Sequence, residues 1–243
     1  RGAVMIAGRE VVGRAGLFLT KKRYGILCLD IEGYQPEGGK LKAMGLEIKR
    51  SDTPEFIQDF LEELLVDCLN GLGEEHVIDK IKEFKKYFKT LEPWGKGMPK
   101  RANNITMYTA KMLEKATAPQ TNSLYKLNTL KNEGKSNMIP GHVRASINWN
   151  NLKKANSDAY SLNITDGAKV IVCKLKNNPM GYTSVAYPTD ELNLPQWFKD
   201  LPFDEEAMEE TVLDKKIENV IGPMGFDLSR TTTSEAFTNF FEF

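Results

Sequence analysis

Long hydrophobic runs are absent from this chain of 243 residues, and the residue types on which catalysis usually depends are scarce. No stretch approaches the roughly 18 apolar residues of a membrane-spanning helix. Only two histidines occur, His76 and His142, and no glycine-rich phosphate loop has the required context. The three cysteines, Cys28, Cys68 and Cys173, lack the spacing of metal ligands, so we expect reduced thiols in an intracellular protein.

Net charge is absent as well, because 33 basic and 33 acidic side chains balance. The two signs are nevertheless segregated along the chain. Residues 1–50 and 99–180 are basic, with net charges of +5 and +9, whereas residues 51–98 and 181–243 are acidic, with net charges of −5 and −9. At a screening length of about 8 Å, such blocks act separately when they lie on different faces. The balanced total therefore does not exclude a nucleic-acid binder, and the basic blocks indicate surfaces that need a partner.

The hydrophobic pattern predicts an α+β fold in which helices dominate. Alternating apolar residues predict strands over 16–20, 24–30, 169–176 and 184–187. Helical spacing predicts a helical hairpin over 53–70 and 77–91, and further helices over 105–115, 145–155 and 205–221. We expect Thr53 to cap the first helix and Pro54 to take its first position. We expect loops over residues 33–39 and 93–101. The basic stretch between 115 and 145 has no strong hydrophobic periodicity.

Two short segments carry chemistry-bearing residues. Lys21, Lys22, Arg23 and Tyr24 place three cations and a phenol between two predicted strands. Such groups bind phosphates and sugars, although a solvated turn is the plainer alternative. Asp30-Ile31-Glu32 is a carboxylate pair at strand spacing, so both acids would share one face. The pair suits a divalent ion, with a solvated or hydrogen-bonded strand end as the alternative.

The order of the residues in these segments resembles family B DNA polymerases. Lys22-Arg23-Tyr24 resembles the family's Lys-x-Tyr motif, which lies in the palm and holds the primer-template duplex. The segment 42–54 resembles the palm-to-thumb junction, a Lys-x-x-Gly-x-Glu-x-x-Arg-x-Asp-x-Pro pattern. Further segments are similar to the thumb and tail of T-even-type bacteriophage replicative polymerases: 102–105, 142–144, 148–150, 178–181, 186–188 and 240–243.

The resemblance implies the C-terminal part of such a polymerase. Residues 1–46 would be the last palm strands, 47–230 a mainly helical thumb with a small β element, and 231–243 an extended tail that binds the sliding clamp. The family's catalytic carboxylates lie upstream of the Lys-x-Tyr motif and have no counterpart in this sequence. We therefore expect no catalytic residue, resident metal or cofactor here, an inactive fragment, and Mg²⁺ in the full polymerase only. Because the sequence begins with Arg1 rather than Met, we expect a segment of a longer protein.

The resemblance and the basic blocks together predict the partners and the binding residues. The partners would be primer-template DNA, the sliding clamp and the upstream palm, fingers and exonuclease domains, with no membrane, in the cytoplasm of an infected bacterial cell. The predicted DNA-binding residues are Lys21, Lys22, Arg23, Tyr24, Lys42, Arg50, Lys100, Arg101, Asn103, Asn104, His142, Arg144, Lys174 and Lys176. The predicted clamp-binding residues are Phe237, Phe240, Phe241 and Phe243.

Several alternatives remain open from the sequence. Asn103 and Asn104 suit the cap of the next helix, and His142 suits a structural hydrogen bond. The tail phenylalanines suit docking onto the protein's own core. At the level of function, the chain could instead be a free-standing, non-enzymatic DNA-binding or clamp-docking module. A third hypothesis is that the chain is a small metal-dependent enzyme that uses Asp30 and Glu32.

Overall fold

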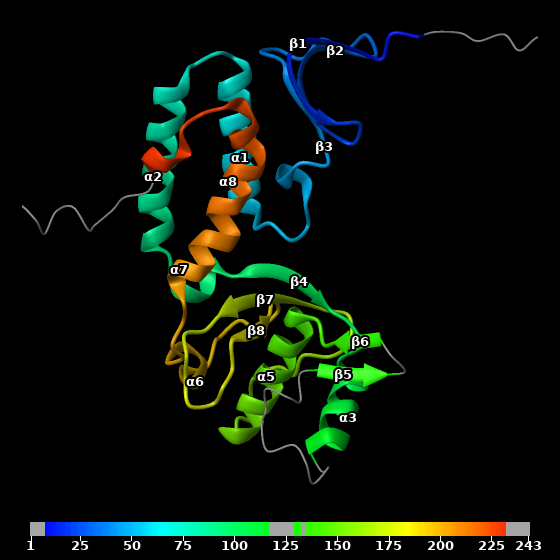
Figure 1. Ribbon diagram of the computed structural model, residues 1–243, viewed down its shortest axis with the longest axis vertical. Helices are drawn as coiled ribbons and strands as arrows, with labels where there is room; N and C mark the ends of the chain where they lie inside the picture. Colours follow the sequence, from blue (N-terminus) through cyan, green and yellow to red (C-terminus); the bar gives the residue numbers. More distant parts are fainter. Residues whose placement is uncertain (1–7, 117–128, 133–134, 232–243) are drawn as a thin grey trace, which may run out of the picture. The chain divides into compact units, whose positions relative to one another are not determined.

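The computed structural model describes residues 8–116, 129–132 and 135–231 (Figure 1). The chain divides into two compact units. The first unit contains residues 1–90 and 213–243, and the second contains residues 91–212. Both contain helices and antiparallel strands, which confirms the predicted α+β class. The first unit includes residues from both sides of the palm–thumb boundary predicted at 46/47.

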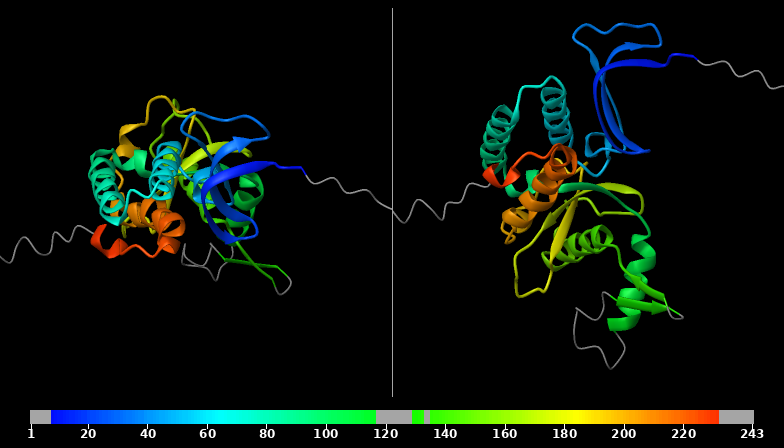
Figure 2. Two further views of the ribbon diagram at one scale, coloured as in Figure 1. Left: turned by 90° about the horizontal axis from the view of Figure 1, so that it is seen from above. Right: turned by 45° about the horizontal axis from the view of Figure 1, so that its top comes forward.

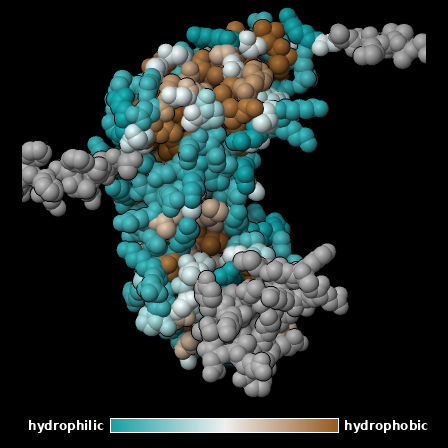
Figure 3. Space-filling view, in the orientation of Figure 1, coloured by the Kyte–Doolittle hydropathy of each residue, from teal (hydrophilic) through white to brown (hydrophobic). Residues whose placement is uncertain are grey.

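The first unit begins with a three-stranded antiparallel sheet, in the order β1-β2-β3. Its strands are β1 (Val11–Thr20), β2 (Arg23–Ile31) and β3 (Lys40–Met44), seen from two further sides in Figure 2. The tight turn expected between the strands predicted over 16–20 and 24–30 is present, but it is one residue shorter than that spacing implied, because Arg23 already pairs with Thr20. Leu27, Cys28 and Leu41 are buried, and Leu27 of β2 is paired with Leu41 of β3. Four apolar side chains of the sheet remain exposed: Val12, Phe18, Leu29 and Met44. Figure 3 shows hydrophobic residues gathered over this unit.

The predicted helical hairpin is confirmed as α1 (Glu55–Leu69) and α2 (Glu74–Thr90). Stacked phenylalanines join the two helices, with the rings of Phe60 and Phe84 centred 3.7 Å apart. The predicted N-cap is wrong by one residue: Pro54 occupies the cap position of α1, and its carbonyl accepts the Ile57 and Gln58 N–H groups. The Thr53 hydroxyl is instead buried, with no hydrogen-bond partner among the described residues.

The predicted helix over 205–221 is broken into three helical segments. They are α7 (Glu205–Met208), a π-helical stretch (Glu209–Asp214) and α8 (Lys215–Ile221). The wider π turn shifts the register of the buried face along the run, and a regular 3.6-residue pattern cannot reveal that shift. Short 3₁₀ turns follow, at Gly222–Met224 and Leu228–Thr231.

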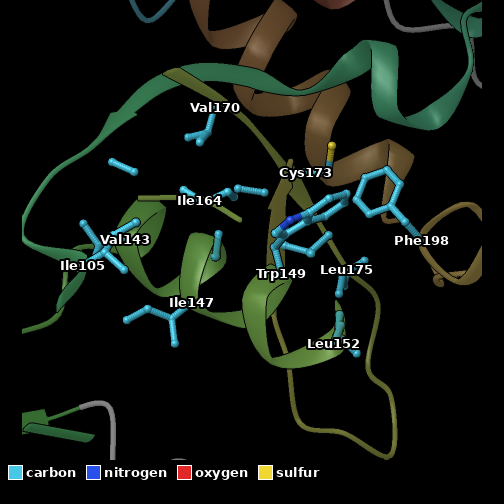
Figure 4. Packing of buried hydrophobic residues seen from close by; sticks show 14 of the residues in the cluster. Ile105, Val143, Ile147, Trp149, Leu152, Ile164, Val170, Cys173, Leu175 and Phe198 are labelled. Atoms are coloured by element: carbon cyan, nitrogen blue, oxygen red, sulfur yellow. The ribbon is translucent and has the colours of Figure 1, made fainter. Parts of the chain in front are cut away.

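The second unit is built on the antiparallel sheet β4-β7-β8. Its strands are β4 (Met98–Ala102), β7 (Ala168–Lys174) and β8 (Ser184–Pro188). Helix α5 (Gly141–Ala155) packs on the sheet and buries Trp149 beside Phe198 of α6 (Gln196–Lys199), as Figure 4 shows. The indole N–H of Trp149 donates to the Leu162 carbonyl at 2.9 Å, so this large side chain is buried without an unmet polar group.

Besides β3, two further stretches that the sequence did not assign to strands are strands. Residues 93–101 were expected to be a loop, but they form a 3₁₀ turn (Pro93–Lys96) and most of β4. Pro99 is tolerated because β4 lies at the edge of its sheet, where one row of N–H groups needs no partner. The stretch without periodicity contains a hairpin of β5 (Thr129–Asn132) and β6 (Lys135–Met138), after α3 (Ile105–Ala116).

The cysteines are free thiols, as expected. Cys28 and Cys173 are fully buried, and burial raises the pKa of Cys68 to about 11. Burial also raises the pKa of Cys173, so Cys68 and Cys173 remain protonated near neutral pH and have little nucleophilic character.

The turn after β3 requires glycine. Gly45 has φ +65°, and a Cβ built there would lie 2.1 Å from the Lys22 carbonyl oxygen. Gly38 provides a matched control, because it has φ +73° and no heavy atom within 4 Å of its added Cβ.

We expect Gly38→Ala to lower the free energy of unfolding by about 1–2 kcal/mol, the cost of the left-handed backbone alone. Gly45→Ala should lose at least about 1 kcal/mol more, because the backbone must also move away from the clash. Urea denaturation of both variants measures the difference. Equal losses would show that the close approach to Lys22 does not constrain the turn.

Candidate nucleic-acid interface

The basic turn presents Lys21 and Lys22 to solvent at the end of the β1–β2 hairpin. Both lysine side chains are exposed. The next two predicted binding residues are more engaged with the protein. Arg23 donates to the Asn219 carbonyl at 3.4 Å, and Tyr24 is half-buried with its ring 6.1 Å from that of Phe18. The turn thus offers two exposed lysines beside an arginine and a tyrosine that contact the rest of the protein.

Lys42 and Arg50 have their charges balanced by neighbouring acids. Lys42 pairs with Glu10, and this hydrogen bond raises the pKa of Lys42 and lowers that of Glu10. Arg50 forms two parallel hydrogen bonds to Asp52, at 3.0 and 3.1 Å. These bonds raise the pKa of the guanidinium. Either residue would have to exchange an internal ion pair for a phosphate.

Most of the junction pattern between Lys42 and Pro54 has a structural role. The carboxylate of Glu47 is buried and lies 2.6 Å from the Lys216 ammonium on α8 and 3.5 Å from the Arg50 guanidinium. Lys216 also lies 3.7 Å from Asp52. The pattern therefore ties the end of the sheet to α8. Lys216 was not identified from the sequence, because no local signal links it to a residue 169 positions away.

Three predicted binding residues meet at one cavity of the second unit. Lys100 comes from β4, His142 from the first turn of α5 and Lys174 from the end of β7, and all three line a cavity of about 530 Å³. Gly141, the first residue of α5, also lines it, so the positive end of a 15-residue helix lies there. Two lysines and one histidine from three elements thus converge on one open space.

One carboxylate, Asp204, also lines the cavity. Its Oδ1 accepts the Ala207 N–H at 3.1 Å and caps α7, while its own N–H donates to the Lys174 carbonyl at 3.0 Å. The negative charge is therefore directed partly to the start of α7. The cationic groups outnumber this single acid in the cavity lining.

Burial lowers the pKa of His142, and the nearby Lys100 ammonium lowers it further. Both effects disfavour a second positive charge in the cavity. The imidazole is therefore neutral near pH 7 and offers one N–H and one acceptor nitrogen.

Other predicted binding residues lie outside this cavity lining. Arg101, Asn103 and Lys176 are exposed. Asn104 adopts φ +61° before α3, but the N–H of Ile105 is accepted by Asp166, so the carboxylate provides this part of the cap. Lys176 lies two residues beyond the end of β7, and its N–H donates to the Pro202 carbonyl at 2.8 Å.

Arg144 is turned back onto its own helix start. Its Nη2 lies 3.4 Å from the Ile139 carbonyl, and its Nε is buried with no hydrogen-bond partner among the described residues. The predicted clamp-binding residues Phe237, Phe240, Phe241 and Phe243 lie outside the described residues.

Asp30 and Glu32 do not form the shared face that the sequence suggested. Strand β2 ends at Ile31, and Glu32 is exposed with φ +52°, whereas Asp30 is buried. Asp30 accepts hydrogen bonds from Arg9 at 3.1 Å and from the Gly33 N–H at 2.8 Å. Its oxygens are thus used by the turn, and no cluster of three or more metal-ligating side chains occurs in the described part of the chain.

Comparison with known proteins relates part of this chain to phage DNA polymerases. No family model matches the chain. Over 178 residues it is 29% identical to the DNA-directed DNA polymerase of Enterobacteria phage T4 and 31% identical to that of Escherichia phage RB69. The chain resembles a region of the T-even-type phage DNA polymerases. Each alignment covers 73% of this chain but only 17% of the relative, so the polymerase-like region is a small part of the length of either relative.

Within the described ranges 8–116, 129–132 and 135–231, no helix is both long and apolar enough to cross a bilayer.

The junction of the polymerase-like region allows a test of the buried ion pair. We expect Lys216→Met to lower the free energy of unfolding by about 3 kcal/mol, because it leaves the buried Glu47 carboxylate with only the more distant Arg50 guanidinium and Asn219 amide, each at 3.5 Å, among its described partners. The control is Lys49→Met, which removes an exposed pair with Glu62 and should cost less than about 1 kcal/mol. Chemical denaturation measures both, and a similar loss in the two variants would contradict a structural role for Lys216.

Proposed function

We propose that the chain is a duplex-holding region of a phage DNA-directed DNA polymerase, comprising the end of the palm and the thumb of a family B enzyme. The similarity to the T4 and RB69 polymerases supports the enzyme class. In this proposal the polymerising carboxylates and their Mg²⁺ belong to other parts of the full enzyme, and the fragment alone is inactive. The phage enzyme would work in the cytoplasm of the infected bacterial cell.

The observation that carries this proposal is the convergence of Lys100, His142 and Lys174 on one cavity. A polymerase must hold duplexes of any sequence, so its contacts go to phosphates and sugars rather than to base edges. Lysines bind phosphates as point charges, and a helix start adds N–H donors directed at an anion. The cavity combines both kinds of group, and Arg101 lies exposed on the same strand as Lys100.

The turn at Lys21 and Lys22 supplies a second contact in the proposal. Two exposed lysines at the tip of a hairpin reach a backbone without any rearrangement of the strands. Lys42, Arg50 and Arg144 contribute less directly, because each of them already holds an acid or a carbonyl of the protein. The sliding clamp, bound by the tail phenylalanines, and the palm, fingers and exonuclease domains complete the proposed set of partners.

A free-standing DNA-binding or clamp-docking module would use the same cations. The coding sequence upstream of Arg1 separates the two functions. Polymerase active-site motifs in the same reading frame support the polymerase, and a start codon immediately upstream supports the module.

Duplex binding by this chain should depend steeply on salt. Lys174→Gln should weaken binding and reduce the slope of log K against log salt by about 1, because one phosphate contact is lost. Lys86→Gln is the matched control, since it removes the same charge from an exposed position on α2, and it should leave the slope unchanged. Fluorescence anisotropy from about 50 to 200 mM salt measures both. Salt-independent binding, or equal effects of the two substitutions, would contradict the assigned site.

A further inference from the structure

The surroundings of His142 in the cavity disfavour protonation of its ring, and a bound phosphate would favour it. His142 is half-buried, it lies beside Lys100, and it is in the first turn of α5. All three circumstances oppose protonation of the ring in the empty cavity. A phosphate in the same space would bring negative charge to a site that already holds Lys100, Lys174 and the helix start.

We propose that this cavity binds a single phosphate group and that His142 takes up one proton from solvent as the phosphate enters. This inference deepens the proposed function and rests on the same cavity. The neutral ring has one nitrogen without a proton, and that nitrogen receives the new proton. Both ring nitrogens are then donors, and the histidine becomes a third cation around the phosphate.

The direction of the pH effect follows from the charges. Burial and Lys100 place the pKa of His142 below its usual value in the free protein. A phosphate offsets the repulsion from Lys100 and pairs with the imidazolium, so the pKa in the complex is higher. Since the complex binds more protons than the free protein between these two pKa values, affinity increases as the pH falls through that window.

Other ionisable groups line the cavity or lie on the elements packed against α5. Asp204 is the acid in the cavity lining, and its Oδ1 accepts the Ala207 N–H at the start of α7. Lys100 and Lys174 are the lysines of the lining. The remaining charged or titratable groups on the described parts of the helices and strands packed against α5 are Arg101 on β4, Tyr108 on α3, Lys169 and Cys173 on β7, and Tyr187 on β8, with Arg144, Lys153 and Lys154 on α5 itself.

The two histidines of the chain make a direct test possible by NMR. Imidazole resonances of the full chain are followed from pH 5 to 8 without ligand, with inorganic phosphate, and with a short DNA duplex. His142→Gln and His76→Gln assign the signals, and His76 is an internal control because it lies in the other unit beside Asp67. We expect phosphate and duplex each to raise the pKa of His142 by about one unit and to leave the His76 signal unmoved.

The corresponding binding measurement uses the same duplex at constant ionic strength. An upward shift of one pKa unit gives an increase in affinity of up to about tenfold as the pH falls from 8 to 5.5. His142→Gln should abolish this increase while preserving the salt dependence, and His76→Gln should keep it. A response of His142 to inorganic phosphate but not to duplex would support the phosphate site and exclude the DNA backbone as its source.

The inference and the proposed function fail in different ways. A tenfold pH effect that survives His142→Gln, or a His142 resonance that neither ligand moves, overturns proton uptake even when duplex binding remains steeply salt-dependent. Absence of duplex binding, together with a phosphate-induced shift of His142, overturns the proposed function and leaves the phosphate site standing.

Discussion

The carboxylate of Glu47 is the constraint on which the first unit depends. An ionised carboxylate removed from water requires a close cation, and Lys216 provides one at 2.6 Å from a position that is itself buried. This pair fastens the segment after β3 to α8, and Arg50 and Asp52 extend it to the start of α1. The sheet, the helical hairpin and α8 thus meet at one cluster of charged side chains, next to the turn that requires glycine at position 45.

Local features of the sequence were sufficient for much of the fold. The apolar spacing in α1 and α2 depends on residues close together in the chain, so the hairpin was predicted closely. β4 was missed because Pro99 and its basic neighbours resemble a loop, and only pairing with β7 makes them a strand. The prediction that Asp30 and Glu32 share one face was wrong because strand β2 ends at Ile31.

The candidate site was predicted residue by residue but not as an arrangement. Charge and resemblance identified Lys100, His142 and Lys174 separately, and only the packing of α5 against the sheet shows that they share a cavity. The same information could not show which internal partners each cation has. Arg50 and Arg144 have the composition of phosphate ligands, yet one holds Asp52 and the other a carbonyl of its own helix start. Lys216 had no signal, because its partner is distant in sequence.

The first unit is discontinuous in the chain, since residues 91–212 are inserted between its two parts. On a ribosome, which adds about 5–20 residues per second, the second unit is therefore complete before α8 has been made. Until α8 has been made, the Glu47 carboxylate lacks its ion-pair partner Lys216, and the helical hairpin lacks the helix that packs on it. The nascent protein must hold an unfinished first unit for several seconds, which makes the order of synthesis part of how this fold is reached.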